Sequence, residues 1–153
     1  YIGNNYWVIL TPGQWEFELV EIKDPNSVWN PNSSRISMSS AHENYTGRNR
    51  YVNETAGAYY ASRLGILENL SERGRQSKCL IIREVTDEYW APTGVWQVRE
   101  SVRNSFNKKH VSVESLSKAI DEIIEHIPVS KNALQRKSEM IKGVQRGLDW
   151  FRS

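Results

Sequence analysis

The sequence predicts a mixed α/β (α+β) domain, with a small sheet early in the chain and a helical carboxy-terminal third. Three observations support this prediction: alternation at residues 15–22, an apolar run at residues 78–85, and helical apolar spacing after residue 112. The chain has 153 residues, 39% of them hydrophobic, which is enough to bury one core. A net charge of +2 and 25% charged residues exclude wholesale disorder.

The sheet is expected to begin with an antiparallel hairpin over residues 6–22. Residues 6–10 form a short aromatic and β-branched run, and Pro12-Gly13 predicts a turn after it. The next strand alternates between two faces, which carry Trp15, Phe17, Leu19 and Glu21 against Glu16, Glu18, Val20 and Ile22. Residues 23–54 are rich in Asn, Ser and Pro and are predicted to form a loop. The apolar run at 78–85 is typical of a strand that is buried on both faces.

Four helices are predicted to cover this sheet. Thr55 is the expected cap of the first helix, and Pro92 and Gly94 precede a second helix at about 93–107. Ser112 can cap a third helix, which Pro128 stops. Residues 130–149 have helical spacing but only a thin apolar face.

Charged residues occur where the apolar patterns predict packing. Arg63 lies beside the apolar stripe of its helix, and Arg83 and Glu84 come at the end of the most hydrophobic strand. In open α/β sheets, ligands bind at that end of the strands. The helix at 93–107 carries a further charged face, formed by Trp96, Arg99, Glu100 and Arg103.

Two interpretations of these charges remain open. In one, Arg–Glu pairs fix the helices against the sheet, because buried charges must be paired. In the other, the guanidinium groups form a pocket that binds a phosphate, with an aromatic ring stacked on a base or ribose. The candidate phosphate- or nucleotide-binding residues are Arg48, Arg50, Arg63, Arg83, Arg99, Arg103 and Trp96. Glu84 and Glu100 are the candidates for a catalytic base.

The sequence gives little sign of other chemistry. It has no glycine-rich phosphate loop and no nucleophile motif. We predict no metal site, because Cys79 is the only cysteine and the three histidines are isolated from one another. The cofactor requirement remains unknown. No apolar run is long enough to cross a membrane, so no membrane partner is expected.

A longer pattern resembles a known family. It includes residues 57–63, Gly-Ala-Tyr-Tyr-Ala-Ser-Arg, and its most specific part ends with residues 94–100, Gly-Val-Trp-Gln-Val-Arg-Glu. With the segments around them, these parts resemble the carboxy-terminal half of the archaeal Nre DNA-repair proteins, in order over residues 6–107. The resemblance implies a cytoplasmic archaeal protein that acts in the repair of damaged DNA, and a larger amino-terminal half elsewhere in the protein. It implies no catalytic mechanism.

The last nine residues resemble the peptide by which repair proteins bind the sliding clamp PCNA. That motif has a Gln, an aliphatic residue three positions later, and aromatic residues six and seven positions later. Arg152 stands at the second aromatic position. The anchors in this chain would be Gln145, Leu148, Trp150 and Phe151. The alternative is a helix end that packs on its own chain. We therefore expect a domain at 1–143 and a clamp-binding tail at 144–153.

Two functions from different classes are consistent with these residues. The first is an archaeal DNA-repair protein that PCNA recruits and that has an Arg/Glu pocket for DNA phosphate or a nucleotide. The second is a phosphodiesterase or nuclease that acts through the same pocket, where the arginines would stabilise developing phosphate charge. The residues alone leave open whether the protein is an enzyme.

Overall fold

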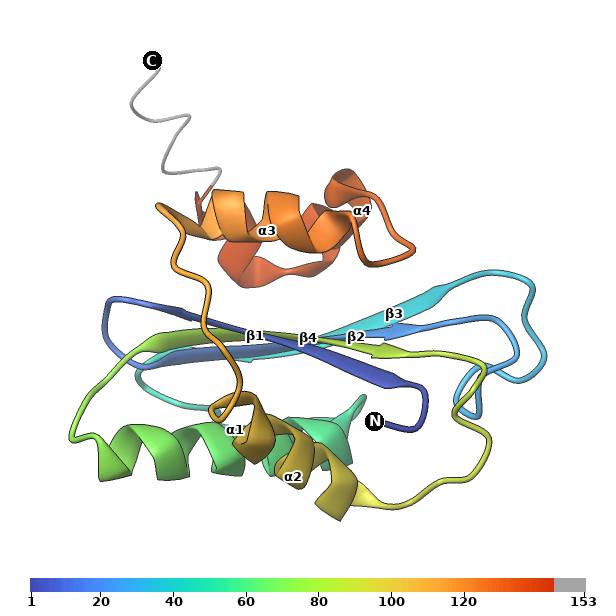
Figure 1. Cartoon of the computed structure of the whole chain (residues 1–153), viewed down its shortest axis with the longest axis horizontal. Coiled ribbons are helices and arrows are strands. Elements are labelled where there is room, and N and C mark those ends of the chain that lie inside the picture. The colour runs from blue at the N-terminus through green and yellow to red at the C-terminus, as the bar shows by residue number, and fades with distance from the viewer. Residues whose placement is uncertain (145–153) are drawn as a thin grey trace.

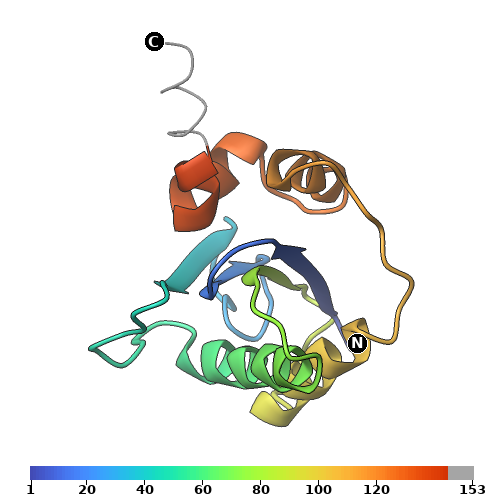
Figure 2. The same cartoon turned by 90° about the vertical axis from the view of Figure 1, so that its left-hand side faces the viewer.

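A computed structural model of the chain describes residues 1–144, which form three layers (Figure 1). Its elements in chain order are β1 (Asn4–Thr11), β2 (Glu16–Lys23), β3 (Ser37–Glu43), α1 (Ala56–Glu72), β4 (Lys78–Val85), α2 (Val95–Ser105), α3 (Leu116–Ile124) and α4 (Lys131–Lys137). A further helical segment covers 139–144. One sheet lies between α1 and α2 on one face and α3 and α4 on the other (Figure 2). The predicted mixed α/β class is confirmed.

The strand order of the sheet is β1-β4-β2-β3. β4 pairs antiparallel with β1 and parallel with β2, so the predicted hairpin of residues 6–22 is wrong. The reason is that β4 is buried on both faces, with every residue from Cys79 to Val85 buried. Such a strand is most stable in the middle of a sheet, where both edges are hydrogen-bonded and both faces are covered.

β3 lies within the segment that was predicted to be a loop, and it forms an edge of the sheet beside β2. Its sequence, Ser-Met-Ser-Ser-Ala-His-Glu, contains no β-branched residue and no Phe, Tyr or Trp. The strand forms because β2 offers it a free edge, along which Phe17 lies opposite Glu43 and Lys23 opposite Ser37. Ser39, Ala41 and Glu43 alternate as its buried residues.

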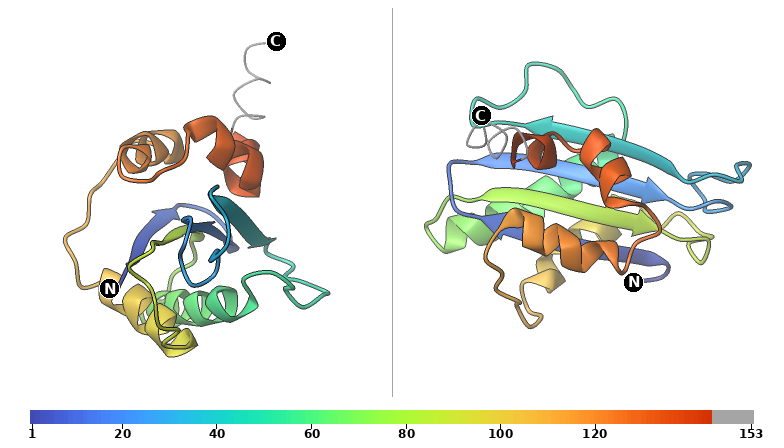
Figure 3. Two further views of the ribbon diagram at one scale, coloured as in Figure 1. Left: turned by 90° about the vertical axis from the view of Figure 1, so that its right-hand side faces the viewer. Right: turned by 90° about the horizontal axis from the view of Figure 1, so that it is seen from above.

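The two faces of the sheet contribute to two separate cores, as the predicted alternation of β2 requires. One core packs α1 and α2 on the sheet, and its strand residues are Phe17, Leu19, Ala41, Cys79 and Ile81. The other packs α3, α4 and the segment 139–144, and its strand residues are Ile9, Val20, Ile22, Leu80 and Ile82. Figure 3 shows this second helical layer crossing the sheet.

The helix boundaries differ from the predicted ones mainly after residue 110. Thr55 is the N-cap of α1, as predicted, but the cap of α3 is Ser115, whose hydroxyl accepts a hydrogen bond from the Lys118 N–H. The predicted helix over 130–149 is interrupted at Ser138, which has an extended backbone. Within residues 1–144 no helix combines the length and the apolar composition that a membrane span requires.

A buried carboxylate explains the interruption at Ser138. Glu18 on β2 accepts hydrogen bonds from the Ser138 hydroxyl at 2.7 Å and from the N–H groups of Glu139 and Met140 at 2.8 and 2.9 Å. Glu18 thus caps the helical segment that starts at residue 139. Burial raises the pKa of Glu18, although these donors favour its ionised form.

Small residues allow α1 and α2 to approach closely. Gly57, Ala61 and Gly65 are spaced four residues apart and therefore share one face of α1. A Cβ atom at Gly65 would lie 3.1 Å from a methyl group of Val102, and one at Gly57 only 2.6 Å from Val95.

We expect the substitution Gly65→Leu to lower the free energy of unfolding by about 1–3 kcal/mol, because the side chain would overpack the interface with α2. Urea denaturation of both proteins measures the difference. Gly143→Leu is the matched control: a Cβ there meets nothing within 4 Å among the described residues. An equal loss in both variants would contradict the close approach of the helices.

Candidate functional site

A cavity of about 480 Å³ lies where the carboxyl ends of two parallel strands meet the amino-terminal ends of two helices. The strands are β2 and β4, which end side by side with Lys23 opposite Val85, and the helices are α1 and α2. We call it the strand-end cavity; its principal lining residues are Glu21, Lys23, Trp29, Thr55, Gly57, Arg83, Tyr89 and Val95. Ligands of open α/β sheets characteristically bind at this end of the strands.

Two basic side chains in the strand-end cavity share one carboxylate. Arg83 is 4% exposed and donates hydrogen bonds to Glu21 and, through Nε and Nη2, to the side-chain oxygen of Asn4 at 3.0 and 2.7 Å. The Lys23 ammonium lies 3.4 Å from the second oxygen of Glu21 and 3.1 Å from the Ser39 hydroxyl. One positive charge therefore remains uncompensated within this group, which suits an anion.

Both helices present free N–H groups to the strand-end cavity. The α1 cap, Thr55, has a left-handed backbone (φ 58°); its side chain accepts no capping bond, and its hydroxyl is buried without a partner among the described residues. Gly94, at the cap of α2, also has positive φ and has no side chain to cap the helix. Neither helix has an acidic residue in its first turn. Uncapped helix ends without carboxylates attract anions.

Loops tied to each other form the mouth of the strand-end cavity. The Val28 N–H donates to the Tyr89 carbonyl at 3.3 Å, which links the segment after β2 to the segment after β4. Tyr89 is 2% exposed, and its hydroxyl accepts a hydrogen bond from the Thr93 N–H at 2.9 Å. Trp29 is 52% exposed and lines the cavity, so an indole is available there for stacking on a base.

Arg63 and Arg48 belong to a different cluster, centred on the buried carboxylate of Glu43. This carboxylate accepts hydrogen bonds from the Trp15 indole at 2.6 Å and from Arg63 Nε at 2.9 Å on one oxygen. Its other oxygen accepts from the Tyr59 hydroxyl at 2.9 Å. Burial, together with that bond, raises the pKa of Tyr59 above its ordinary value. Arg48 lies over the Tyr59 ring, 5.8 Å from its centre.

Arg99, Glu100 and Arg103 form an ion-pair network on the outer side of α2. Arg103 donates two parallel hydrogen bonds to Glu68 of α1, at 2.8 and 2.7 Å, and a third to Glu100 at 2.6 Å. Arg99 Nε lies 3.6 Å from the same Glu100 oxygen. Hydrogen bonding to Arg103 lowers the pKa of Glu68. For these residues the structure therefore supports the first of the two interpretations of the sequence, in which Arg–Glu pairs fix one element against another.

The predicted residues therefore do not converge in one cleft. Glu84 follows Arg83 on β4 and so faces the opposite side of the sheet, where it accepts a hydrogen bond from the Asn5 amide at 2.8 Å. Trp96 is 51% exposed in the first turn of α2, next to the cavity mouth but not in its lining. Arg50 is exposed in the loop before α1. The four predicted clamp anchors lie outside the described residues.

Sequence reasoning missed most of the strand-end cavity. The sequence does predict Arg83 as a site residue, because it lies at the end of an apolar strand. Lys23 and Glu21 end β2 in the same way, but their proximity to Arg83 depends on the parallel pairing that the hairpin prediction excluded. Trp29 carried one usable signal, since it is a tryptophan in a polar segment rich in Asn, Pro and Ser.

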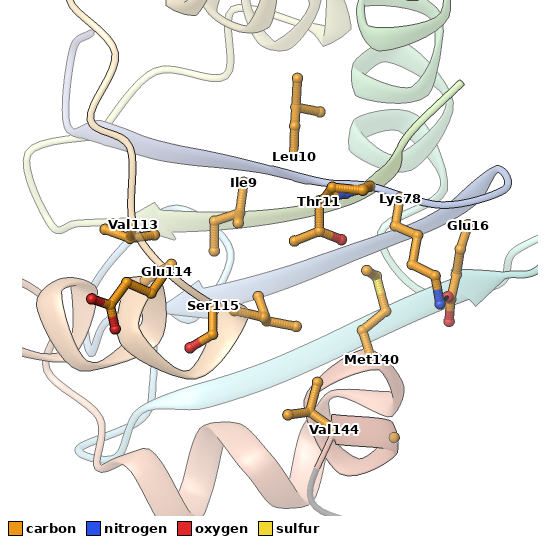
Figure 4. Close-up of a pocket in the computed structure, with 14 residues that line it drawn as sticks. Ile9, Leu10, Thr11, Glu16, Lys78, Val113, Glu114, Ser115, Met140 and Val144 are labelled. Carbon is orange, nitrogen blue, oxygen red and sulfur yellow. Dashed lines mark ion pairs between the residues drawn. The ribbon is translucent and has the colours of Figure 1, made fainter. Parts of the chain in front are cut away.

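A second cavity of similar volume lies on the opposite face of the sheet (Figure 4). Ile9 and Met140 line it, and one end is closed by Glu16 and Lys78, whose charged atoms are 2.7 Å apart. Glu16 is partly buried, but the bonds from Lys78 and His42 outweigh this and lower its pKa. Lys78 is the only basic residue among its described lining residues, and it is already paired with Glu16. The cavity therefore offers no free cation for a phosphate.

The fold and the strand-end cavity define a three-layer α/β domain with an anion-suited cleft at the ends of its parallel strands. The chain belongs to the archaeal Nre family: the family model described as "Archaeal Nre, C-terminal" matches residues 43–151, and "Archaeal Nre, N-terminal" matches residues 1–30. The predicted resemblance is confirmed and extends to the amino-terminal model. No solved structure matches the chain.

Three curated relatives are similar to this chain. DNA repair protein NreA of Haloferax volcanii is 54% identical over 146 residues, which cover 95% of the chain and 35% of the relative. DNA repair protein NreA of Archaeoglobus fulgidus is 40% identical over 120 residues, covering 78% and 30%. DNA repair protein NreB of the same organism is 31% identical over 146 residues, covering 95% and 37%. The chain spans about a third of the length of these relatives.

We expect Glu43→Gln to lower the free energy of unfolding by about 1–3 kcal/mol, because an amide nitrogen would replace one oxygen of a carboxylate that now accepts from three donors. Thermal and urea denaturation measure the loss. Glu54→Gln, at an exposed position of the neighbouring loop, should change the stability by less than about 0.5 kcal/mol. Unchanged stability of Glu43→Gln would show that the cluster does not hold β3 to α1.

Proposed function

We propose that this protein acts in archaeal DNA repair, in the cytoplasm, and that its strand-end cavity binds a DNA phosphate or a nucleotide. The observation that carries the proposal is the similarity to relatives named DNA repair proteins, one of them 54% identical across nearly the whole chain. The cavity supports the ligand class, because Arg83 and Lys23 share a single carboxylate there.

The arrangement of the strand-end cavity fits the parts of a nucleotide. The uncapped first turns of α1 and α2 supply N–H donors for phosphate oxygens. Trp29 supplies a ring at the mouth for a base, and Val95 an apolar wall. The charged and apolar portions of the lining thus match a phosphate and a base respectively.

The same geometry favours binding over catalysis in this part of the protein. Glu21 is the carboxylate that lines the strand-end cavity, and it is held by both Arg83 and Lys23. Its oxygens are therefore already engaged by these two cations and are not free to contact a substrate. Glu84 and Glu100, the candidates for a base in a phosphodiesterase or nuclease, lie on the other sheet face and on the outer side of α2.

We also propose that residues 144–153 form a separate tail that recruits the protein to PCNA. The support is the motif itself: a Gln, an aliphatic residue and an aromatic residue at the spacing of clamp-binding peptides. In this proposal residues 1–143 form the domain and the tail is the contact with the clamp.

For the strand-end cavity, we expect Lys23→Gln to weaken the binding of a deoxynucleoside monophosphate and of inorganic phosphate by about tenfold, because one charge-assisted bond is lost. Calorimetric titration of the full chain measures both ligands. Lys118→Gln, an exposed position on α3, is the control that should bind like the parent. Identical binding by Lys23→Gln and the parent, with melting temperature unchanged, would rule out phosphate binding in the cavity.

For the tail, we expect deletion of 145–153 to abolish PCNA binding and to leave the folding of the domain intact. Leu148→Ala and Phe151→Ala should each weaken binding by more than about 1 kcal/mol, because buried apolar anchors dominate such interfaces. Arg152→Ala should weaken it less, because an exposed charge contributes mainly to the association rate. Calorimetry with purified archaeal PCNA measures all four. Equal affinity of the intact and truncated chains would favour packing of the tail on its own chain.

A further inference from the structure

An exposed tyrosine is held flat against the protein in the loop between β3 and α1, which stands out from the domain (Figure 2). Tyr51 is 70% exposed, yet its ring stacks on Tyr60 of α1, with centroids 4.7 Å apart and planes 25° apart. Tyr60 is itself fixed by an edge contact with Tyr59 at 5.1 Å and by the Val52 N–H, which donates to its hydroxyl at 3.2 Å. One face of Tyr51 is thus occupied, and its orientation is set in advance.

Three arginines come close to Tyr51 and Tyr60 in the chain: Arg48 and Arg50 lie in the same loop, and Arg63 lies on α1. Arg48 uses its hydrogen bonds on two backbone carbonyls, those of His42 at 2.6 Å and Arg50 at 3.2 Å, so no carboxylate among the described residues neutralises it. The Arg50 side chain is exposed, with no partner in the described part of the chain. Arg63, one turn after Tyr60, shares Glu43 with Trp15 and Tyr59. Among the described residues, the only carboxylate that any of these three arginines contacts is Glu43, which pairs with Arg63.

We propose that this surface, formed by Arg48, Arg50, Tyr51, Tyr60 and Arg63, binds single-stranded DNA by stacking one unpaired base on Tyr51. A base has a flat π-face that a pre-oriented ring can receive, and the adjacent phosphates are the ligands that guanidinium groups prefer. The choice of DNA as the strand rests on the proposed function. The surface is separate from the strand-end cavity, since none of its residues lines that cavity.

The geometry selects an unpaired strand over a duplex. In a duplex both faces of each internal base are covered by its neighbours, so Tyr51 could reach a face only at an end or after unstacking, which costs a few kcal/mol. With only three guanidinium groups, the surface offers few of the phosphate contacts that sequence-independent duplex binding uses.

The test is fluorescence anisotropy of the full chain with a labelled oligodeoxythymidylate of about 15 nucleotides, which is long enough for one binding site. Its duplex and the matching oligoribonucleotide are measured beside it. Tyr51→Ala should weaken binding of the DNA single strand by about 5- to 150-fold, the range measured for loss of one stacked base. Tyr51→Phe should restore binding, because it keeps the ring. Arg50→Gln should reduce the slope of log affinity against log salt by about 0.7, the value for one phosphate contact on a single strand.

Matched controls separate this surface from the strand-end cavity. Tyr45→Ala removes another exposed tyrosine from the same loop and should leave binding unchanged. Tyr51→Ala should bind a deoxynucleoside monophosphate like the parent. Lys23→Gln should bind that ligand about tenfold more weakly and retain the stacking contribution of Tyr51.

Three results would overturn the assignment of this surface to single-stranded DNA. These are no binding of the single strand by the parent, binding that Tyr51→Ala leaves unchanged, and an equal loss of binding in Tyr45→Ala. Binding of the oligoribonucleotide alone would overturn the choice of DNA.

Discussion

The structure depends on β4, a strand buried on both faces and paired along both edges. Because its side chains from Cys79 to Ile82 are inaccessible, it needs a helical layer above and below and a neighbour on each side. β1 supplies the antiparallel neighbour and β2 the parallel one. The parallel pairing brings the carboxyl ends of β2 and β4 together and so creates the strand-end cavity.

Buried carboxylates connect the sheet to the layers around it. Glu18 holds the helical segment at 139–144, Glu43 holds α1, and Glu21 holds the cations of the strand-end cavity. Glu18 and Glu43 accept hydrogen bonds from helical residues that are far away in the sequence, whereas Glu21 pairs with Arg83 of β4 and with Lys23 of its own strand. A buried charge without its partner destabilises a fold strongly, so the contacts of Glu18 and Glu43 favour one placement of the helices that they bind.

The sequence predicted individual helices and strands better than it predicted which of them lie side by side. The limits of β4 and the start of α1 after Thr55 were predicted correctly, because an apolar run and a capping residue before an apolar stripe are local signals, although the Thr55 side chain makes no capping bond. The predicted strand order was wrong, since alternation shows which residues share a face but does not show which strands pair. β3 was missed because its polar composition forms a strand only beside β2. The partner of Arg63 could not be predicted for the same reason, as Glu43 ends that strand.

The two family regions meet inside the sheet. The amino-terminal match ends at residue 30, after β2, and the carboxy-terminal match starts at residue 43, the last residue of β3. β1 and β2 belong to the first region, and β4, which lies between them, belongs to the second. The strand-end cavity takes Lys23 from one region and Arg83 from the other, so it exists only where both are joined. The five residues of the surface around Tyr51 all lie in the second region, where Trp15 of the first region contacts Arg63 and its partner Glu43.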